Sequence, residues 1–303
     1  MNELTLTTVT AVCKLFIMML VGMIAAKAGL LTKKVSDGLT DVLVYLITPL
    51  NVFSAFLGGY DPQKAHGMML SLYATVFFYV IALAAGWILA PKGRPNAAVE
   101  RICIAFANTG FIGQPVVYTL FGAEGVMYVA VQRIIFTLVF YTYGVMLLEG
   151  EFSKEKLKKA VLSPVVILAL LGTVVYMARI PVPAFLAAPI TSIGDCATPM
   201  AMLVCGGIVA RSDMKAVIKR PRAYMISAVR LIVLPLLTLV FCKLLSMPTI
   251  VSLTAVIVAG CPIGTTCVFF AEKYGQDSAY VSGMFGITTL ACMVTMPLLA
   301  ALF

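Results

Sequence analysis

Charged residues are scarce in this sequence. Only 12% of its 303 residues are Asp, Glu, Lys or Arg, whereas 61% are hydrophobic. A soluble domain carries about twice that share of charge, so a water-soluble fold is excluded. Lipid is the solvent that fits this composition, and in lipid every backbone polar group must be hydrogen-bonded within the protein. The apolar runs have helix length and do not alternate, which favours an all-α integral membrane protein over a β-barrel.

Histidine and clustered acidic residues are also scarce. The chain has one histidine, His66, and 13 acidic residues that are scattered along it. A membrane-embedded enzyme needs acids, histidines or a nucleophile gathered at depth, so we expect no enzyme, no cofactor and no metal. The eight cysteines all fall in apolar runs without metal-ligand spacing. We therefore expect them to be small buried hydrophobic residues.

The apolar runs predict ten membrane spans. Each is close to the roughly 20 residues that a helix needs to cross the bilayer. Numbered in chain order, spans 1 to 10 are expected at residues 8–28, 39–57, 67–89, 98–120, 126–148, 161–179, 185–209, 223–245, 249–270 and 279–302.

The net charge of +9 arises from basic residues that lie mainly in the short gaps between these runs. That pattern reports membrane orientation and does not indicate nucleic-acid binding. Alternate gaps hold sixteen Lys and Arg residues, Arg101 among them, whereas the remaining gaps hold only Lys64, Arg179 and Lys243. Lys and Arg favour the cytoplasmic side. We therefore expect a multi-pass protein of the cell (inner) membrane with both termini outside the cytoplasm.

The two halves of the chain resemble each other. Thr48-Pro49 in span 2 recurs 150 residues later as Thr198-Pro199 in span 7. NTGFIGQP (108–115) in span 4 matches GCPIGTT (260–266) in span 9, with the two prolines 147 residues apart. An aromatic-glycine turn follows each, with the glycines at positions 122 and 275. These offsets predict two five-span repeats, 1–150 and 151–303, of opposite topology because five is odd. The alternative is a chance recurrence of common Gly and Pro residues.

Spans 4 and 9 combine a proline with flanking glycines, so we expect both helices to be broken within the membrane. The second half of each should begin near its proline. Two half-helix N-termini would then meet near the midplane with partial positive charge and free N–H groups, which suits an anion. The candidate substrate-binding residues are Asn108, Thr109, Gln114, Pro115, Pro262, Thr265, Thr266 and, after the span 2 kink, Asn51. The alternative for the polar members is that they only join helices.

Three basic residues lie inside apolar runs: Lys14, Arg133 and Arg230. Intramembrane arginines are costly and often functional, so Arg133 and Arg230 are possible charge partners of an anion. The alternative is that they extend to the nearer interface. Lys14 and Asp195 lie at similar depth and are expected to form a structural ion pair.

These motifs resemble the auxin efflux carrier family along essentially the whole chain. NTGFIGQP resembles that family's Asn-Thr-x-x-x-Gly-x-Pro pattern, and CPIGTTCVFFAEKYGQD resembles its second broken helix and following turn. LITPLNVFSAF and IGDCATPMAMLVCGG resemble its proline-kinked helices 2 and 7. The loop between spans 5 and 6 is only a dozen residues here, as in the short-looped bacterial members, and Asn51 departs from the plant pattern.

The resemblance implies ten helices in two inverted repeats, a fold like that of the sodium/bile-acid symporters and sodium/proton antiporters. Helices 1, 2, 6 and 7 would form a scaffold, and the others would form a transport domain that moves like an elevator. Substrate would bind where helices 4 and 9 cross, with Asn108 contacting its carboxylate and Pro115 and Pro262 at the crossing. The resemblance also implies a homodimer in the lipid bilayer.

Together these features predict a secondary transporter of small organic anions, such as malonate, malate or auxin-like acids. One alternative is a sodium- or proton-coupled symporter on the same fold. Glu124, Glu272 and Asp277 lie toward helix ends, which weakens that hypothesis. The other alternative is a transporter-like membrane sensor without turnover.

Overall fold

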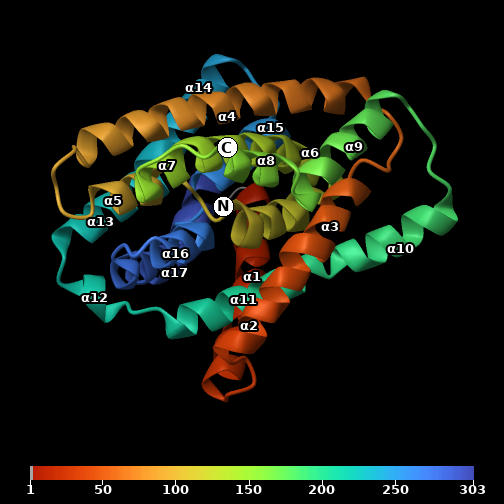
Figure 1. Ribbon diagram of the computed structural model, residues 1–303. Helices are drawn as coiled ribbons and strands as arrows, with labels where there is room; N and C mark the ends of the chain where they lie inside the picture. Colours follow the sequence, from red (N-terminus) through yellow and green to blue (C-terminus); the bar gives the residue numbers. More distant parts are fainter. Residues whose placement is uncertain (1–2) are drawn as a thin grey trace.

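The computed structural model describes residues 3–303, which are helical throughout except for turns and one isolated β-bridge (Figure 1). Helices α1 to α17 and the π-helical turns η1 to η4 follow in chain order. They are α1 Glu3–Lys27, α2 Lys33–Val42, η1 Leu43–Ile47, α3 Thr48–Ser54, α4 Pro62–Leu89, α5 Ala97–Ala105, η2 Thr109–Gly113, α6 Gln114–Val139, η3 Phe140–Gly144, α7 Val145–Glu149, α8 Lys154–Val161, α9 Pro164–Met177, α10 Ala184–Asp195, α11 Ala197–Arg211, α12 Lys215–Ile218, α13 Pro221–Ala228, η4 Val229–Val233, α14 Leu234–Leu244, α15 Thr249–Ala259, α16 Thr265–Lys273 and α17 Ser278–Ala300.

Among the described residues, six helical segments are long and apolar enough to cross a membrane, and a seventh results if the bent pair α8–α9 counts as one span. The chain is therefore an all-α, multi-pass membrane protein. One of the six, Thr109–Glu149, has 41 residues. At 1.5 Å per residue it is about 60 Å long. That is about twice the hydrocarbon core of a bilayer. Its helical path is interrupted at Gly122, with φ 58° and ψ −141°.

Prolines explain three of the four π-helical turns. A proline has no N–H and its ring crowds the carbonyl four residues earlier, so the helix widens in front of it. The residue before each proline donates instead to the carbonyl five residues back, as Thr48 does to Leu43. The turns η1, η2 and η4 each precede such a proline, namely Pro49, Pro115 and Pro235.

Helices α1 and α11 approach so closely that their backbones touch. A Cβ added at Gly22 would lie 2.3 Å from the carbonyl oxygen of Leu203, and one at Gly206 would lie 2.0 Å from that of Met19. Small residues permit such contacts between membrane helices, where packing rather than the hydrophobic effect drives association. The pair forms one wall of the largest apolar core.

Left-handed backbone conformations recur at a nearly constant spacing. Six of the residues with positive φ form three pairs separated by 150, 153 and 153 positions. The pairs are Gly29 with Arg179, Gly93 with Ser246, and Gly122 with Gly275. Each marks a turn between helices, so turns with a positive φ occur at corresponding positions in both halves of the chain. Both glycines of the aromatic-glycine turns are among them.

Two predictions about surface and core residues are wrong. Arg101 does not lie in an exposed gap: it is 2% exposed within α5, where its Nε donates to Ala90 O and its guanidinium lies 3.7 Å from the Trp87 ring centroid. The open carbonyl end of α4 and the aromatic face together bind the cation. Six of the eight cysteines are buried as expected, but Cys13 and Cys196 are exposed.

Candidate functional site

The two broken helices meet at their breaks. Helix α5 ends at Ala105 and α15 ends at Ala259, and the chain continues as helix only at Thr109 and Thr265. The unwound segments run antiparallel and pair at Ala107 and Ile263. Asn108 N donates to Pro262 O at 2.8 Å, and Gly264 N donates to Phe106 O at 3.0 Å. Each break therefore satisfies backbone groups that the other leaves without an intrahelical partner, which an apolar environment requires.

Arg230 compensates the carbonyl ends of both first half-helices. Its side chain is 0% exposed, and its Nε donates to Cys261 O at 3.1 Å and its Nη1 to Ile104 O at 3.3 Å. These carbonyls lie at the C-terminal ends of α15 and α5, where a helix carries partial negative charge. The guanidinium also lies over the Phe78 ring of α4. Extension of Arg230 to the membrane interface is therefore excluded.

The N-terminal ends of the second half-helices have no such counter-charge. Asn108, 3% exposed, caps η2 by accepting a hydrogen bond from Phe111 N through Oδ1, and its Nδ2 has no acceptor among the described residues. Glu124, Glu272 and Asp277 are paired elsewhere, with Lys64, Lys33 and Arg220 respectively. The positive partial charge of these ends is therefore uncompensated by any of the ion pairs that the described residues form.

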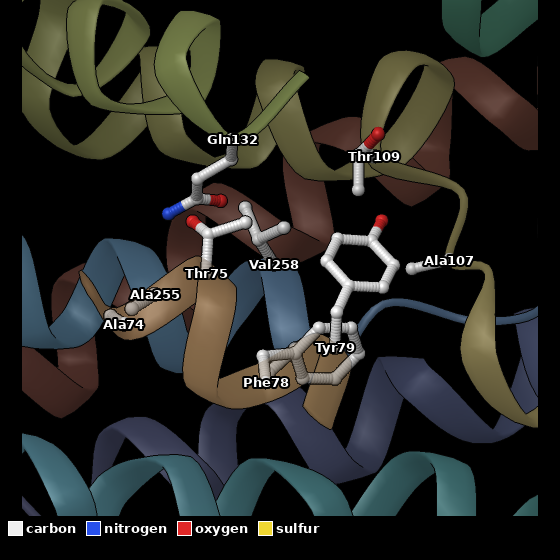
Figure 2. A pocket seen from close by; sticks show the side chains of 10 residues that line it. Ala74, Thr75, Phe78, Tyr79, Ala107, Thr109, Gln132, Ala255 and Val258 are labelled. Atoms are coloured by element: carbon white, nitrogen blue, oxygen red, sulfur yellow. The ribbon is translucent and has the colours of Figure 1, made fainter. Parts of the chain in front are cut away.

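A small cavity adjoins the crossing, between α4, α6 and α15 (Figure 2). The Tyr79 hydroxyl is directed toward Thr109, and the Gln132 amide lies next to Thr75. Gln132 donates to Ser71 Oγ through Nε2, but its Oε1 has no partner within the described chain. About 20 Å³ of this cavity is open to a water-sized sphere, enough for about one water molecule.

The predicted site residues divide between the crossing and its surroundings. Thr109 lines the cavity, and the Pro262 carbonyl accepts a hydrogen bond from the backbone N–H of Asn108. Pro115 is not at the break, because the second half of the helix begins at Thr109 with the π-helical turn that Pro115 itself causes. The expectation that this half begins near Pro115 is therefore wrong. Thr265 and Thr266 open α16, partly buried, but they are not among the residues that line the cavity.

Asn51 and Gln114 face each other rather than the cavity. Gln114 Nε2 donates to Asn51 Oδ1 at 2.6 Å, and Asn51 Nδ2 donates to Gly194 O at 3.0 Å. A Cβ at Gly194 would lie 2.8 Å from Asn51 Cα, so α3 and α10 are in backbone contact there. These hydrogen bonds connect the first turn of α6 to α3 and α10.

The expected ion pair between Lys14 and Asp195 is absent from the described residues. Asp195 instead accepts a hydrogen bond from the Tyr118 hydroxyl at 2.8 Å, and the Lys14 side chain is exposed. Depth along two spans was a poor guide to pairing, because Asp195 is turned toward α6. Tyr118 follows Gln114 by four residues, so both side chains project from one face of α6 toward α3 and α10.

A double-mutant cycle tests the hydrogen bond between Asn51 and Gln114. We expect Asn51→Leu and Gln114→Leu each to lower the free energy of unfolding, and the double variant to lose about 1 kcal/mol less than the sum. Chemical denaturation of the detergent-purified protein measures this. Gln114→Leu combined with Thr142→Ala, a distant and partly buried site, should be additive. Additivity of the Asn51 and Gln114 changes would show that the two side chains do not interact.

Sequence reasoning missed the polar residues of α4 at the cavity: Thr75 and Tyr79 line it, and Ser71 accepts a hydrogen bond from the lining residue Gln132. Ser71, Thr75 and Tyr79 follow one another at four-residue intervals inside an apolar run. That spacing places them on one helical face, which was the signal available in the sequence. Gln132 had no comparable signal, because a single amide in a span is equally consistent with helix association.

Comparison with known proteins also indicates a membrane transporter. No match was found among curated proteins. The family model described as membrane transport protein matches residues 7–300, nearly the whole chain. The resemblance to the auxin efflux carriers is therefore confirmed at the level of the family. This chain is a membrane transporter and belongs to the membrane transport protein family, that of the auxin efflux carriers.

Proposed function

We propose that this transporter is a secondary carrier of small organic anions, with carboxylates such as malonate, malate or auxin-like acids as the substrate class. The observation that carries the proposal is the pair of crossed helix breaks. Their carbonyl ends are compensated by Arg230, whereas none of the acidic residues in the described part of the chain provides a counter-charge at their N-terminal ends. A site with uncompensated N–H groups in a low-dielectric medium favours a negatively charged guest.

The topology that fits this proposal has ten spans in two inverted repeats, 1–150 and 151–303. The 41-residue segment is interrupted at Gly122: together with α5, the part before Gly122 forms one span, and the part after it forms the next. The recurrence of positive-φ turns 150 to 153 residues apart supports the repeat. With the basic residues of the alternate gaps in the cytoplasm, both termini lie outside, as expected for the cell membrane.

An elevator-type cycle accounts for the size of the cavity. Space for one water molecule is too little for a carboxylic acid, so substrate entry requires helices to separate at the crossing. Helices α9, α3, α10, α11 and α1 form a chain of contacts in this order, and α4 contacts each of α5, α6, α14 and α15. We assign the first group to the scaffold and the second to the transport domain, and the scaffold is the natural interface of a homodimer.

Transport by purified protein in liposomes tests the proposal. We would screen acetate, malonate, malate, benzoate and indole-3-acetate by thermal shift and then measure uptake of the acids that stabilise the protein. Uptake that is unchanged by imposed sodium or pH gradients supports a uniporter, and gradient-driven accumulation supports the ion-coupled alternative. Binding without any net flux would indicate a sensor. If none of the five acids bound, the proposed substrate class would be wrong.

Asn108→Ala should raise the KM for a transported acid about 10-fold or more. The variant removes the buried Nδ2 donor, and a hydrogen bond to a charged group contributes about 1.5–3 kcal/mol. Loss of the Asn108 cap also lowers the unfolding temperature slightly. Initial rates of uptake at varied substrate concentration measure the KM, with Thr142→Ala as the control. An unchanged KM for Asn108→Ala would remove this residue from the substrate site.

A further inference from the structure

Arg133 on α6, unlike Arg230, makes no side-chain hydrogen bond among the described residues, although Arg230 also has one buried nitrogen without a partner, its Nη2. Its Nη1 is buried and has no acceptor, and none of the five ion pairs among the described residues includes Arg133. Arg230 donates to two carbonyls through Nε and Nη1. A buried guanidinium N–H without an acceptor destabilises a protein by more than an ordinary unpaired donor, because the group is charged.

The guanidinium of Arg133 lies directly against the turn that opens the second half-helix. A Cβ at Gly110 would lie 2.3 Å from Arg133 Nη1 and 3.0 Å from its Cζ. Glycine at position 110 therefore makes room for the guanidinium. Gly110 follows Asn108 by two residues, and Asn108 Nδ2 is likewise a buried donor without an acceptor. Two unpartnered N–H donors thus flank one turn, and one of them carries a full positive charge.

The space on the other side of Arg133 is apolar. The space beside it is lined by apolar side chains of α3, α6 and α9, including Val52, Val165 and Ala169. That space admits no water-sized sphere. Nη1 is therefore neither paired within the described chain nor hydrated in this conformation. The space lies between α6, which carries Arg133, and the α3–α9 pair, which we assign to the scaffold.

We infer that Arg133 binds the carboxylate of the transported anion, on the scaffold-facing side of the crossing. The inference rests on the proposed function and deepens it by naming the positive charge that selects an anion over its uncharged amide. The carboxylate accepts hydrogen bonds from Arg133 Nη1 and from Asn108 Nδ2 when the α3–α9 pair and α6 move apart. A bound anion satisfies both donors at once, and a carboxylate is the acceptor that a guanidinium binds most strongly.

Selectivity between acid and amide tests this inference. Thermal shift titrations would compare acetate, malonate, benzoate and indole-3-acetate with acetamide, malonamide, benzamide and indole-3-acetamide. For wild-type protein we expect each bound acid to bind more tightly than its amide. Arg133→Gln should weaken acid binding about 10- to 100-fold and leave amide binding within 2-fold, because only the acid loses a charged partner. Arg133→Lys, which keeps the charge but not the fork of donors, should recover part of the loss.

Two controls separate this result from a general effect. Arg94→Gln removes one positive charge at an exposed position and should leave acid binding unchanged. The unfolding temperature of each variant without ligand reports whether it is folded. If Arg133→Gln does not fold, the acid and amide affinities of Arg133→Lys are compared with those of the wild-type protein instead. If wild-type protein prefers acids and Arg133→Gln retains that preference, this inference is overturned while the proposed function stands. If wild-type protein binds none of the acids, both are overturned.

Discussion

Gly206→Ala is expected to lower the free energy of unfolding by about 3 kcal/mol, toward the upper end of what overpacking costs. A Cβ at this position would lie 2.0 Å from Met19 O and 2.8 Å from Met23 N. Both atoms belong to the α1 backbone, so no side-chain rotation relieves the clash, and α1 and α11 must separate. Thermal and chemical unfolding of the detergent-purified protein measure the loss, and size-exclusion chromatography reports whether the fold survives.

Gly38→Ala is the matched control for this experiment. Gly38 lies in α2, has no atom within 4 Å of an added Cβ and does not have a positive φ. The same chemical change should there be neutral or stabilise by up to about 1 kcal/mol, because alanine restricts the unfolded chain more than glycine. Equal stability of the two variants would show that α1 and α11 are not in backbone contact at Gly206.

Arg230→Met is expected to reduce uptake at least about 100-fold and to lower the unfolding temperature clearly. Removing the guanidinium leaves Cys261 O and Ile104 O without their donor at the crossing, and each buried unpaired carbonyl costs about 1–3 kcal/mol. The C-terminal ends of α5 and α15 also lose the positive charge that compensates them. Both effects act where we place the substrate, so the geometry of the site changes along with its stability.

Arg101→Met separates the two effects. Arg101 is also a buried arginine that binds a helix-terminal carbonyl, but that carbonyl is Ala90 O at the end of α4 and belongs to neither unwound segment. We expect this variant to unfold at a lower temperature while keeping the KM of the wild-type protein. Uptake and unfolding would be measured on both variants in parallel. If Arg230→Met lost stability but kept full transport, Arg230 would be structural only.

The ends and breaks of the helices were largely predictable from local sequence. Pro262 with Gly260 and Gly264 predicts a break in an apolar run, and the structure has no helix from Gly260 to Gly264. The glycines at positions 122 and 275 predict turns, and both have positive φ. Such features are local, because a missing N–H or a missing Cβ acts within one turn of the backbone.

Side-chain partners were not predictable in the same way. Asn51 was expected at the cavity but binds Gln114 and Gly194, and Asp195 binds Tyr118 rather than Lys14. Each of these contacts joins residues more than 60 positions apart. Periodicity assigns a residue to a helical face, but it does not say which other helix covers that face.

The amino-acid sequence by itself determined the membrane as solvent, the helical class and the two helix breaks, because composition and backbone chemistry decide these locally. The tertiary structure alone decided that the breaks pair with each other, that Arg230 Nε and Nη1 bind carbonyls and that Arg133 Nη1 has no acceptor among the described residues. The reason is that two arginines in apolar runs are chemically identical until packing places acceptors beside one of them and apolar side chains beside the other.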